Sequence, residues 1–260
     1  MCLVVFAFHQ DIRYPLVLAA NRDEFFARPT RDAQFWQEDP ETAQILAGRD
    51  LSQGGTWLGI NRIGRIAIIT NIRDPSISTK HKLSRGRLVL DFLTGALTAV
   101  DYLNNVRANL DAYAGFNLLI GDWDSLYFLN SDNGEPLQLA PGIYGISNGS
   151  LDDPWPKVTN GKLRLQQLML TQHPPKIEQL MQLLQNRDIA ADSELPATGV
   201  PLELERRLSA SFIVNPQRDY GTRCSTALVI DQRGMVQFCE QNYRNDGETS
   251  TRHYYEFEML

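Results

Sequence analysis

Cys2 and the tetrapeptide Asn21-Arg22-Asp23-Glu24 carry the side chains near the start of the chain that are best suited to nucleophilic chemistry. A thiol reacts as its thiolate, which a nearby guanidinium such as that of Arg22 favours. If Met1 is removed, Cys2 also carries a free α-amine. That amine titrates near ~7.7–8.0, against ~8.5 for a thiol, and can accept the thiol's proton. Asp23 can then orient either Arg22 or the new ammonium group. The alternative is that Cys2 only packs, as a small apolar residue of a strand.

Two short apolar runs must position these residues. Leu3–Phe8 and Leu16–Ala20 are rich in Val, Leu and Phe, and a polar stretch separates them. This pattern predicts two buried strands joined by a hairpin loop. With the turn in the middle of the polar stretch, antiparallel pairing brings Cys2 opposite Asn21 or Arg22.

A second hairpin is predicted over residues 54–71, with its turn at Asn61-Arg62-Ile63-Gly64. Counting back across this turn puts Asn71 opposite Gly54. Glycine at a strand end lets a ligand approach closely, and the Asn71 amide can donate to a developing oxyanion. The structural alternative is that Gly54 and Gly55 form a bulge and that Asn71 caps the next turn.

The rest of the chain predicts helices alternating with hairpins. Residues 25–50 are irregular and polar and predict a long surface loop. Helices are expected over residues 84–93, 98–113, 154–169, 176–185 and 202–208, and strands over 116–121, 126–130, 142–146, 224–230, 235–243 and 252–257. Local hairpins imply antiparallel sheets, and two helical blocks can cover two stacked sheets. We therefore predict an α+β fold, a four-layer α-β-β-α sandwich, in one domain over residues 1–260.

Further candidates lie at strand and helix ends. Asn148 follows a predicted strand and serves either as a second oxyanion donor or as the turn residue of an Asn-Gly pair. Trp155 stands between two prolines, which suits a pocket wall or a packing anchor. Four basic side chains form either an anion site or a solvated face: Arg73, Lys82, Arg85 and Arg87.

As a set, several motifs along the chain resemble the NRDE family, also called the transport and Golgi organisation family. They are Asn21-Arg22-Asp23-Glu24, Gly54-Gly55-Thr56-Trp57-Leu58-Gly59, Thr70-Asn71-Ile72-Arg73, Ser147-Asn148-Gly149, Pro154-Trp155-Pro156-Lys157-Val158 and Gly221-Thr222-Arg223. The family is similar in architecture to the N-terminal-nucleophile hydrolases, especially those with cysteine at the second position. The resemblance implies the same four-layer fold.

The resemblance also implies roles for particular residues. Asn71 would inherit the oxyanion role, and Arg223 would be the late arginine placed near the nucleophile in related cysteine hydrolases. The ligand pocket would draw on the motif residues Asn21, Glu24, Gly54, Gly55, Trp57, Arg73 and Trp155, and on Arg85 near the start of a predicted helix. Cys224 stands where a hydroxyl residue is expected in this family, so Cys224 and Cys239 are expected to pack.

Composition excludes several classes of protein. The chain has 260 residues, 43% of them hydrophobic and 22% charged, as in ordinary globular proteins. A net charge of −6 argues against nucleic-acid binding by bulk electrostatics. There is no secretory signal and no run near the ~20 apolar residues that span a bilayer, so we expect a cytoplasmic protein without a transmembrane segment. The three cysteines and four histidines show no metal-site spacing, so no metal is expected.

Two functions fit these residues. In the first, processed Cys2 hydrolyses a non-peptide amide or a thioester through an acyl-enzyme, with its own α-amine as the base and no cofactor. In the second, the family's links to haem trafficking and to acyl-CoA or lipid handling imply a carrier that uses the same pocket. No CxxCH haem attachment is present, so any haem would be a transient ligand. Ligand identity and oligomeric state stay open.

Overall fold

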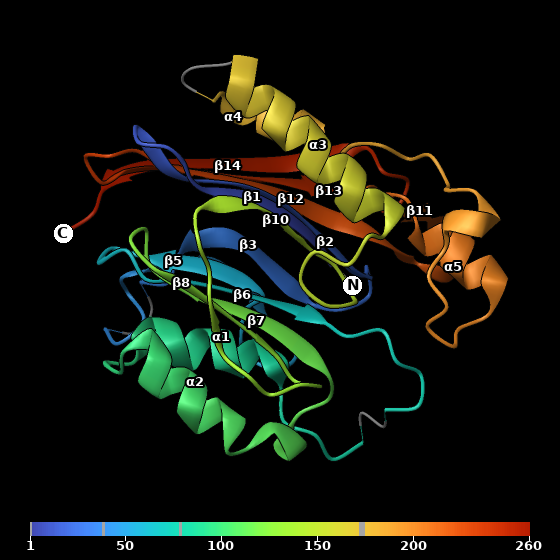
Figure 1. Ribbon diagram of the computed structural model, residues 1–260, viewed down its shortest axis with the longest axis horizontal. Helices are drawn as coiled ribbons and strands as arrows, with labels where there is room; N and C mark the ends of the chain where they lie inside the picture. Colours follow the sequence, from blue (N-terminus) through green and yellow to red (C-terminus); the bar gives the residue numbers. More distant parts are fainter. Residues whose placement is uncertain (1, 38–39, 78–79, 172–174) are drawn as a thin grey trace.

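Two antiparallel sheets lie face to face between two layers of helices (Figure 1). The computed structural model describes residues 2–37, 40–77, 80–171 and 175–260. Over this part of the chain each sheet has seven strands, and all the pairs are antiparallel. The predicted four-layer α-β-β-α sandwich is confirmed.

The first sheet is built from the two ends of the chain. Its order is β10-β1-β2-β12-β13-β14, with β11 beside β12. The strands are β1 Cys2–Asp11, β2 Tyr14–Phe25, β10 Gly142–Ile146, β11 Val214–Asn215, β12 Tyr220–Ile230, β13 Met235–Tyr243 and β14 Thr249–Glu258. The N-terminal hairpin is therefore central, and β12 pairs with β2 along nearly its whole length.

The second sheet follows chain order, β3-β4-β5-β6-β7-β8-β9, as a meander. Its strands are β3 Thr30–Phe35, β4 Ile45–Asp50, β5 Leu58–Asn61, β6 Ile66–Asn71, β7 Phe116–Gly121, β8 Leu126–Asn130 and β9 Leu137–Gln138. Each connection is local except β6 to β7, which carries two helices.

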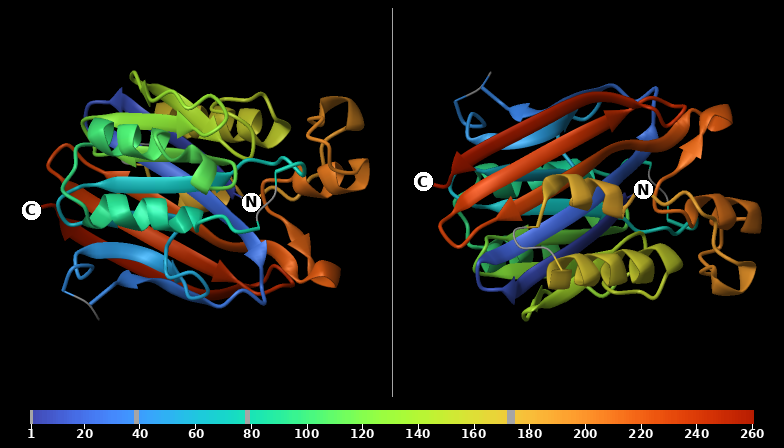
Figure 2. Two further views of the ribbon diagram at one scale, coloured as in Figure 1. Left: turned by 90° about the horizontal axis from the view of Figure 1, so that it is seen from below. Right: turned by 90° about the horizontal axis from the view of Figure 1, so that it is seen from above.

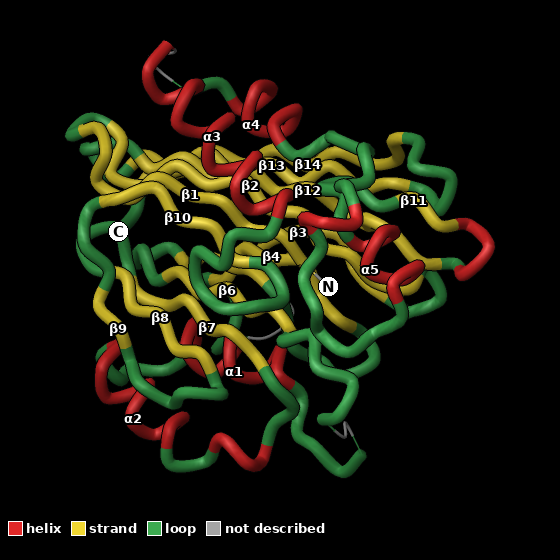
Figure 3. Tube along the Cα trace, turned by 45° about the vertical axis from the view of Figure 1, so that its right-hand side comes forward, coloured by secondary structure: helices red, strands yellow, loops and turns green. Residues whose placement is uncertain are grey.

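Helices cover the outer face of each sheet (Figure 2). Helices α1 Arg85–Thr94 and α2 Ala99–Arg107 lie on the second sheet, while α3 Pro156–Thr171 and α4 Ile177–Leu183 lie on the first. Helix α5 Leu202–Leu208 stands at the end of the sandwich where β1 begins (Figure 3). All five predicted helices are present, although α2 ends before the predicted boundary at residue 113.

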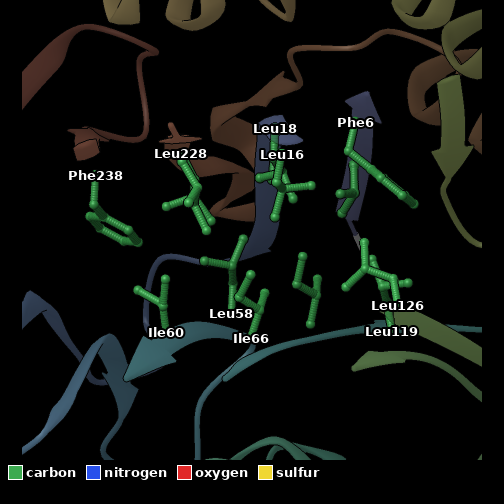
Figure 4. Packing of buried hydrophobic residues seen from close by; sticks show 14 of the residues in the cluster. Phe6, Leu16, Leu18, Leu58, Ile60, Ile66, Leu119, Leu126, Leu228 and Phe238 are labelled. Atoms are coloured by element: carbon green, nitrogen blue, oxygen red, sulfur yellow. The ribbon is translucent and has the colours of Figure 1, made fainter. Parts of the chain in front are cut away.

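Strand alternation explains the layering, because successive side chains of a strand point to opposite faces. In β1, Val4, Phe6 and Phe8 belong to the core between the sheets. The intervening residues, such as Leu3 and Val5, pack with Val158 of α3 in a separate outer core. Figure 4 shows the inner core, with side chains of β1, β2, β12 and β13 facing those of the second sheet.

Two local predictions are wrong. Residues 25–50 are not one long loop, because β3 and β4 pair within them. The six residues of β3 include only two apolar ones, Ala33 and Phe35, so the strand lacks a clear alternating pattern.

Asn71 is also not opposite Gly54. The chain at Gly54 turns with a φ of 77°, its N–H bonds the Asp50 carbonyl, and β5 begins only at Leu58.

The inner core yields a stability prediction. Phe6 is fully buried between the sheets, so Phe6→Ala should lower the free energy of unfolding by about 3–5 kcal/mol through lost burial and a residual cavity. Chemical denaturation would measure this loss. Leu170→Ala is the control, because Leu170 is 74% exposed and should change stability by less than about 0.5 kcal/mol. Equal losses for both variants would contradict the assigned core.

Candidate active site

Cys2 opens into a pocket of about 430 Å³. Its walls come from the starts of β1 and α1, from the ends of β2 and β6, and from the segment that precedes β5. Eight of the residues expected from the sequence line it: Cys2, Arg22, Asp23, Glu24, Trp57, Asn71, Lys82 and Arg85. The structure therefore brings the thiol, its guanidinium neighbour and one candidate oxyanion donor into one cavity.

Strand register places Arg22 beside the thiol. Cys2 pairs with Arg22, so the predicted antiparallel register is confirmed. The two residues have the same parity as Val4 and Ala20, which belong to the inner core, so their side chains share the face between the sheets. Arg22 is only 6% exposed, and its guanidinium lies 4.0 Å from the centre of the Trp57 ring. This stacking fixes a desolvated positive charge at the pocket wall.

The environment of the thiol contains opposing influences. Burial raises the pKa of Cys2, and the Asp23 carboxylate raises it further. Arg22 and a hydrogen bond from the Asp23 backbone N–H lower that pKa. Without further activation the thiol is mostly protonated at neutral pH. Met1, whose removal would supply the α-amine, lies outside the described residues.

Two asparagines that were expected to bind an oxyanion have different roles. Asn71 lines the pocket, and no described residue hydrogen-bonds its side-chain amide. Asn148 is 1% exposed and does not line the pocket, and its Nδ2 donates to the Asn71 carbonyl at 2.8 Å. Asn148 therefore holds the backbone that presents Asn71, and it lies outside the pocket lining.

The pocket lining holds four basic side chains and three carboxylates. Arg28 is paired with Asp50 at 2.7 Å and lies 3.8 Å from Glu24. Arg85 is partly buried, which lowers its pKa, and it donates only to the Gly115 carbonyl among described residues. Lys82 donates to the Asp111 carbonyl. Neither Lys82 nor Arg85 has a carboxylate partner in the described part of the chain.

Arg73, Trp155 and Arg223 do not line this pocket. Arg73 forms a buried ion pair with Glu205 of α5, and its guanidinium lies 4.8 Å from the centre of the Trp155 ring. Trp155 thus anchors packing. Arg223 is the extra residue of a bulge in β12, between the pairs Thr222–Asp23 and Cys224–Arg22. Its guanidinium donates to the carbonyls of residues 25, 26 and 28 and so braces the end of β2.

Three further motif residues are structural. The Asn21 amide donates to the carbonyls of Leu184 and Ser211, which ties β2 to the chain beyond α4. Gly54 makes the turn described above. An added Cβ at Gly55 would lie 2.5 Å from the Gly86 carbonyl group, so only glycine allows this close approach to the start of α1. Cys224 and Cys239 are buried, as expected.

Sequence reasoning missed several residues around the site. Arg28 and Asp50 line the pocket but lay in the segment taken for a loop. Thr222 and Lys157 occur in the quoted motifs but were given no role. Thr222 donates to Asp23 at 2.7 Å, and Lys157 is 3% exposed and lines a second cavity, outside the Cys2 pocket. The sequence did offer a signal for Lys157, because a lysine directly after Trp-Pro at the start of a helix lies where a buried residue is expected.

Comparison with known proteins identifies the family. The family model for Transport and Golgi organisation 2 matches residues 1–245. The chain belongs to this family. Its relatives include the Transport and Golgi organization protein 2 homolog of Bos taurus, 37% identical over 93% of each chain. The Homo sapiens homolog is 34% identical over 93% of each chain. The resemblance inferred from the motifs is confirmed.

Among solved structures, the Caenorhabditis elegans N-acylethanolamine-hydrolyzing acid amidase (NAAA) ortholog has a similar fold. The TM-score is 0.50, the sequence identity is 12%, and the match covers 88% of this chain and 92% of that one. At this identity the similarity concerns the fold alone. This chain therefore shares its four-layer fold with that amidase ortholog.

The described residues hold neither a candidate metal cluster nor a candidate membrane-spanning helix. No cluster of three or more His, Cys, Asp or Glu side chains there is arranged to hold a metal ion. Within the same residues, none of the helices has the length and apolar character needed to cross a membrane.

The ion pair behind the pocket leads to a prediction. Glu205→Met should destabilise the fold by about 3–5 kcal/mol, because it leaves the buried Arg73 charge without its carboxylate. The double variant Arg73→Met/Glu205→Met should be much closer to the wild type, since neither buried charge remains. Urea unfolding of the three proteins tests this. A double variant less stable than Glu205→Met would show that the pair contributes more than charge compensation.

Proposed function

We propose that this protein is a cysteine-type N-terminal-nucleophile hydrolase that cleaves a non-peptide amide or a thioester through an acyl-enzyme on Cys2. The supporting observation is that Cys2 and Asn71 line one pocket, with the Asn71 side-chain amide bonded to no described residue. A nucleophile and a free hydrogen-bond donor in one cavity are what acyl transfer requires.

The proposed reaction begins with removal of Met1, which leaves a free α-amine on Cys2. This amine takes the thiol proton, and the thiolate attacks the substrate carbonyl carbon to form a new C–S bond. The carbonyl π electrons move to oxygen, where the Asn71 amide donates to the oxyanion. The α-ammonium then returns its proton to the leaving amine or thiolate as the scissile bond breaks. Water, deprotonated by the same amine, releases the acid and regenerates the thiol.

The surrounding charges suit this chemistry. Arg22 favours the thiolate from a fixed position over Trp57. Asp23 is 1% exposed and can hold the new ammonium group near the thiol. Amine activation is needed because burial raises the pKa of Cys2. Asn148 and Arg223 act indirectly, by fixing the backbones that carry Asn71 and the end of β2.

This proposal predicts that the purified protein lacks Met1 and that Cys2 is the cysteine alkylated first by a limiting reagent. On an amide or thioester that acylates the protein, Cys2→Ala should lower turnover by about a thousandfold or more. Asn71→Ala should lower kcat about 100- to 1000-fold, with thermal stability retained. Intact-mass spectra before and after labelling, followed by trapping of the acyl-enzyme, measure these effects.

The matched control is Asn105→Ala, because Asn105 is exposed on α2, a helix that contributes no residue to the pocket lining. It should leave turnover unchanged. A retained Met1, or full turnover by the Cys2→Ala protein, would exclude the amine mechanism.

A second candidate function is transient binding of an anionic ligand such as an acyl-CoA or haem, without hydrolysis. Lys82 and Arg85 favour it, because both line the pocket and neither is paired with a carboxylate among described residues. Guanidinium and ammonium groups placed in this way suit the phosphates of an acyl-CoA or the propionates of haem.

For this second candidate we expect saturable binding of an acyl-CoA or of haem, followed by the fluorescence of Trp57 in the pocket wall. The double variant Lys82→Ala/Arg85→Ala should weaken that binding at least about tenfold, the loss of one or two charged contacts. Arg87→Ala is the control, since Arg87 pairs with Asp91 on the solvent side of α1. An affinity that is the same in the double variant as in the wild type would exclude this use of the pocket. So would the absence of saturable binding.

A further inference from the structure

Cys2 borders a second, much smaller cavity, which we call the inner recess. Its volume is about 10 Å³, against about 430 Å³ for the main pocket. A space of that size has room for about one water molecule. Its walls include four apolar side chains of the core between the sheets: Val4, Ala20, Leu58 and Ile68. Cys2 therefore stands between a tight apolar recess and a large polar pocket.

The wall shared by the recess and the main pocket is held in place. Arg22, Trp57 and Ile69 line both spaces. The Arg22 guanidinium lies 4.0 Å from the centre of the Trp57 ring, and the ring also packs directly on Gly48 of β4, where an added Cβ would overlap it. The Trp57 carbonyl accepts from the Ile69 N–H at 2.9 Å. Because its ring and its backbone are both in contact with neighbours, Trp57 cannot turn aside to widen the recess.

The main pocket has a different character. Besides its charged side chains, it is lined by four polar residues: Gln53, Thr56, Asn71 and Ser84. A chain of methylene groups is stabilised where its surface leaves water for apolar walls, and charged and amide groups do not supply such walls. An anionic group, in contrast, can form charge-assisted hydrogen bonds with Lys82 and Arg85, which have no carboxylate partner among the described residues.

We propose that the Cys2 site acts on small hydrophilic substrates, whose acyl group is about the size of an acetyl group and whose leaving group carries an anion held by Lys82 and Arg85. This rests on the proposed function and names its substrate class. The Cys2 thiolate attacks the carbonyl carbon and forms a C–S bond. The bond to the leaving group then breaks, and the leaving group takes the proton of the α-ammonium. The short acyl group occupies the recess, while the leaving group lies in the main pocket.

The test compares four thioesters that separate acyl length from charge. Acetyl-CoA and octanoyl-CoA share an anionic leaving group, while the matching thioesters of N-acetylcysteamine have a neutral one. Mass spectrometry follows acylation of Cys2, and each rate is divided by that of free cysteine. Acetyl-CoA should react at least about 100-fold faster than octanoyl-CoA, the scale of steric discrimination in an apolar pocket. It should react at least about tenfold faster than the neutral acetyl thioester, as for the loss of charged contacts.

A change in the wall of the recess tests the size limit. Leu58→Ala removes side-chain atoms that line the recess and should reduce the preference for acetyl over octanoyl at least about tenfold, because a cavity takes their place. Leu126→Ala is the matched control, since Leu126 belongs to the same core but lies apart from Leu58, on the side of Phe6 (Figure 4). It should keep the wild-type preference. If Leu58→Ala does not fold, Leu58→Val carries the same measurement.

A change in the main pocket tests the anionic group. The double variant Lys82→Ala/Arg85→Ala should lose the preference for acetyl-CoA over the neutral acetyl thioester, while Arg87→Ala should keep it. Three results would each overturn the proposal. They are octanoyl-CoA acylating Cys2 as fast as acetyl-CoA, a wild-type preference in Leu58→Ala, and equal rates for the charged and neutral acetyl thioesters.

Failure of this proposal is distinguishable from failure of the proposed function. Alkylation needs no turnover, so iodoacetamide and N-octyl iodoacetamide probe the space around Cys2 directly. Relative to free cysteine, the octyl reagent should label Cys2 at least about tenfold more slowly, and Leu58→Ala should reduce this difference. If no thioester acylates Cys2 but this selectivity is observed, the hydrolase proposal fails and the size limit stands. If all four thioesters acylate Cys2 at similar rates, the hydrolase stands and the size limit fails.

Discussion

The strict alternation of side chains along β1 and β2 is the constraint on which the rest of the structure depends. Both strands are central in their sheet and are covered on both faces, so every position must satisfy one of two different cores. The same alternation continues into the polar ends of the strands. It sends Cys2 and Arg22 into the space between the sheets and Asp23 toward α3. A slip of one residue would exchange these faces and dismantle both the core and the site.

Charges behind and beside the pocket are held by elements far apart in sequence. Glu205 of α5 neutralises Arg73, and the Thr222 hydroxyl of β12 donates to Asp23 of β2. On the other side of the first sheet, the buried Glu240 of β13 accepts from the Ala33 N–H of β3 at 2.7 Å, which links the two sheets. Buried charges of this kind contribute little net stability, but removal of either partner is costly. They therefore fix the geometry of the site more than they stabilise the fold.

Much of the fold was predictable because strong local signals agree with the tertiary arrangement. The hairpin at residues 58–71 and the helix at residues 156–171 have clear turn residues or periodic apolar residues. The strand β3 was missed because its six residues are mostly polar, and it pairs at an edge where neighbouring strands supply the order. Residue types alone also assigned too many basic residues to the pocket. Arg73 pairs with Glu205 and Arg223 donates to backbone carbonyls, so neither lines the pocket.

By itself, the sequence determined the family through its motifs and the layered α-β-β-α architecture through apolar periodicity, and it placed Cys2 opposite Asn21 or Arg22, because these signals are local properties. Only the tertiary structure decided which polar residues share the pocket. Asn71 faces it while Asn148 is bonded to the Asn71 carbonyl, and Lys157 lines a second cavity instead. The physical reason is that each buried polar group must find a partner, and those partners come from segments whose meeting depends on how the sheets and helices pack.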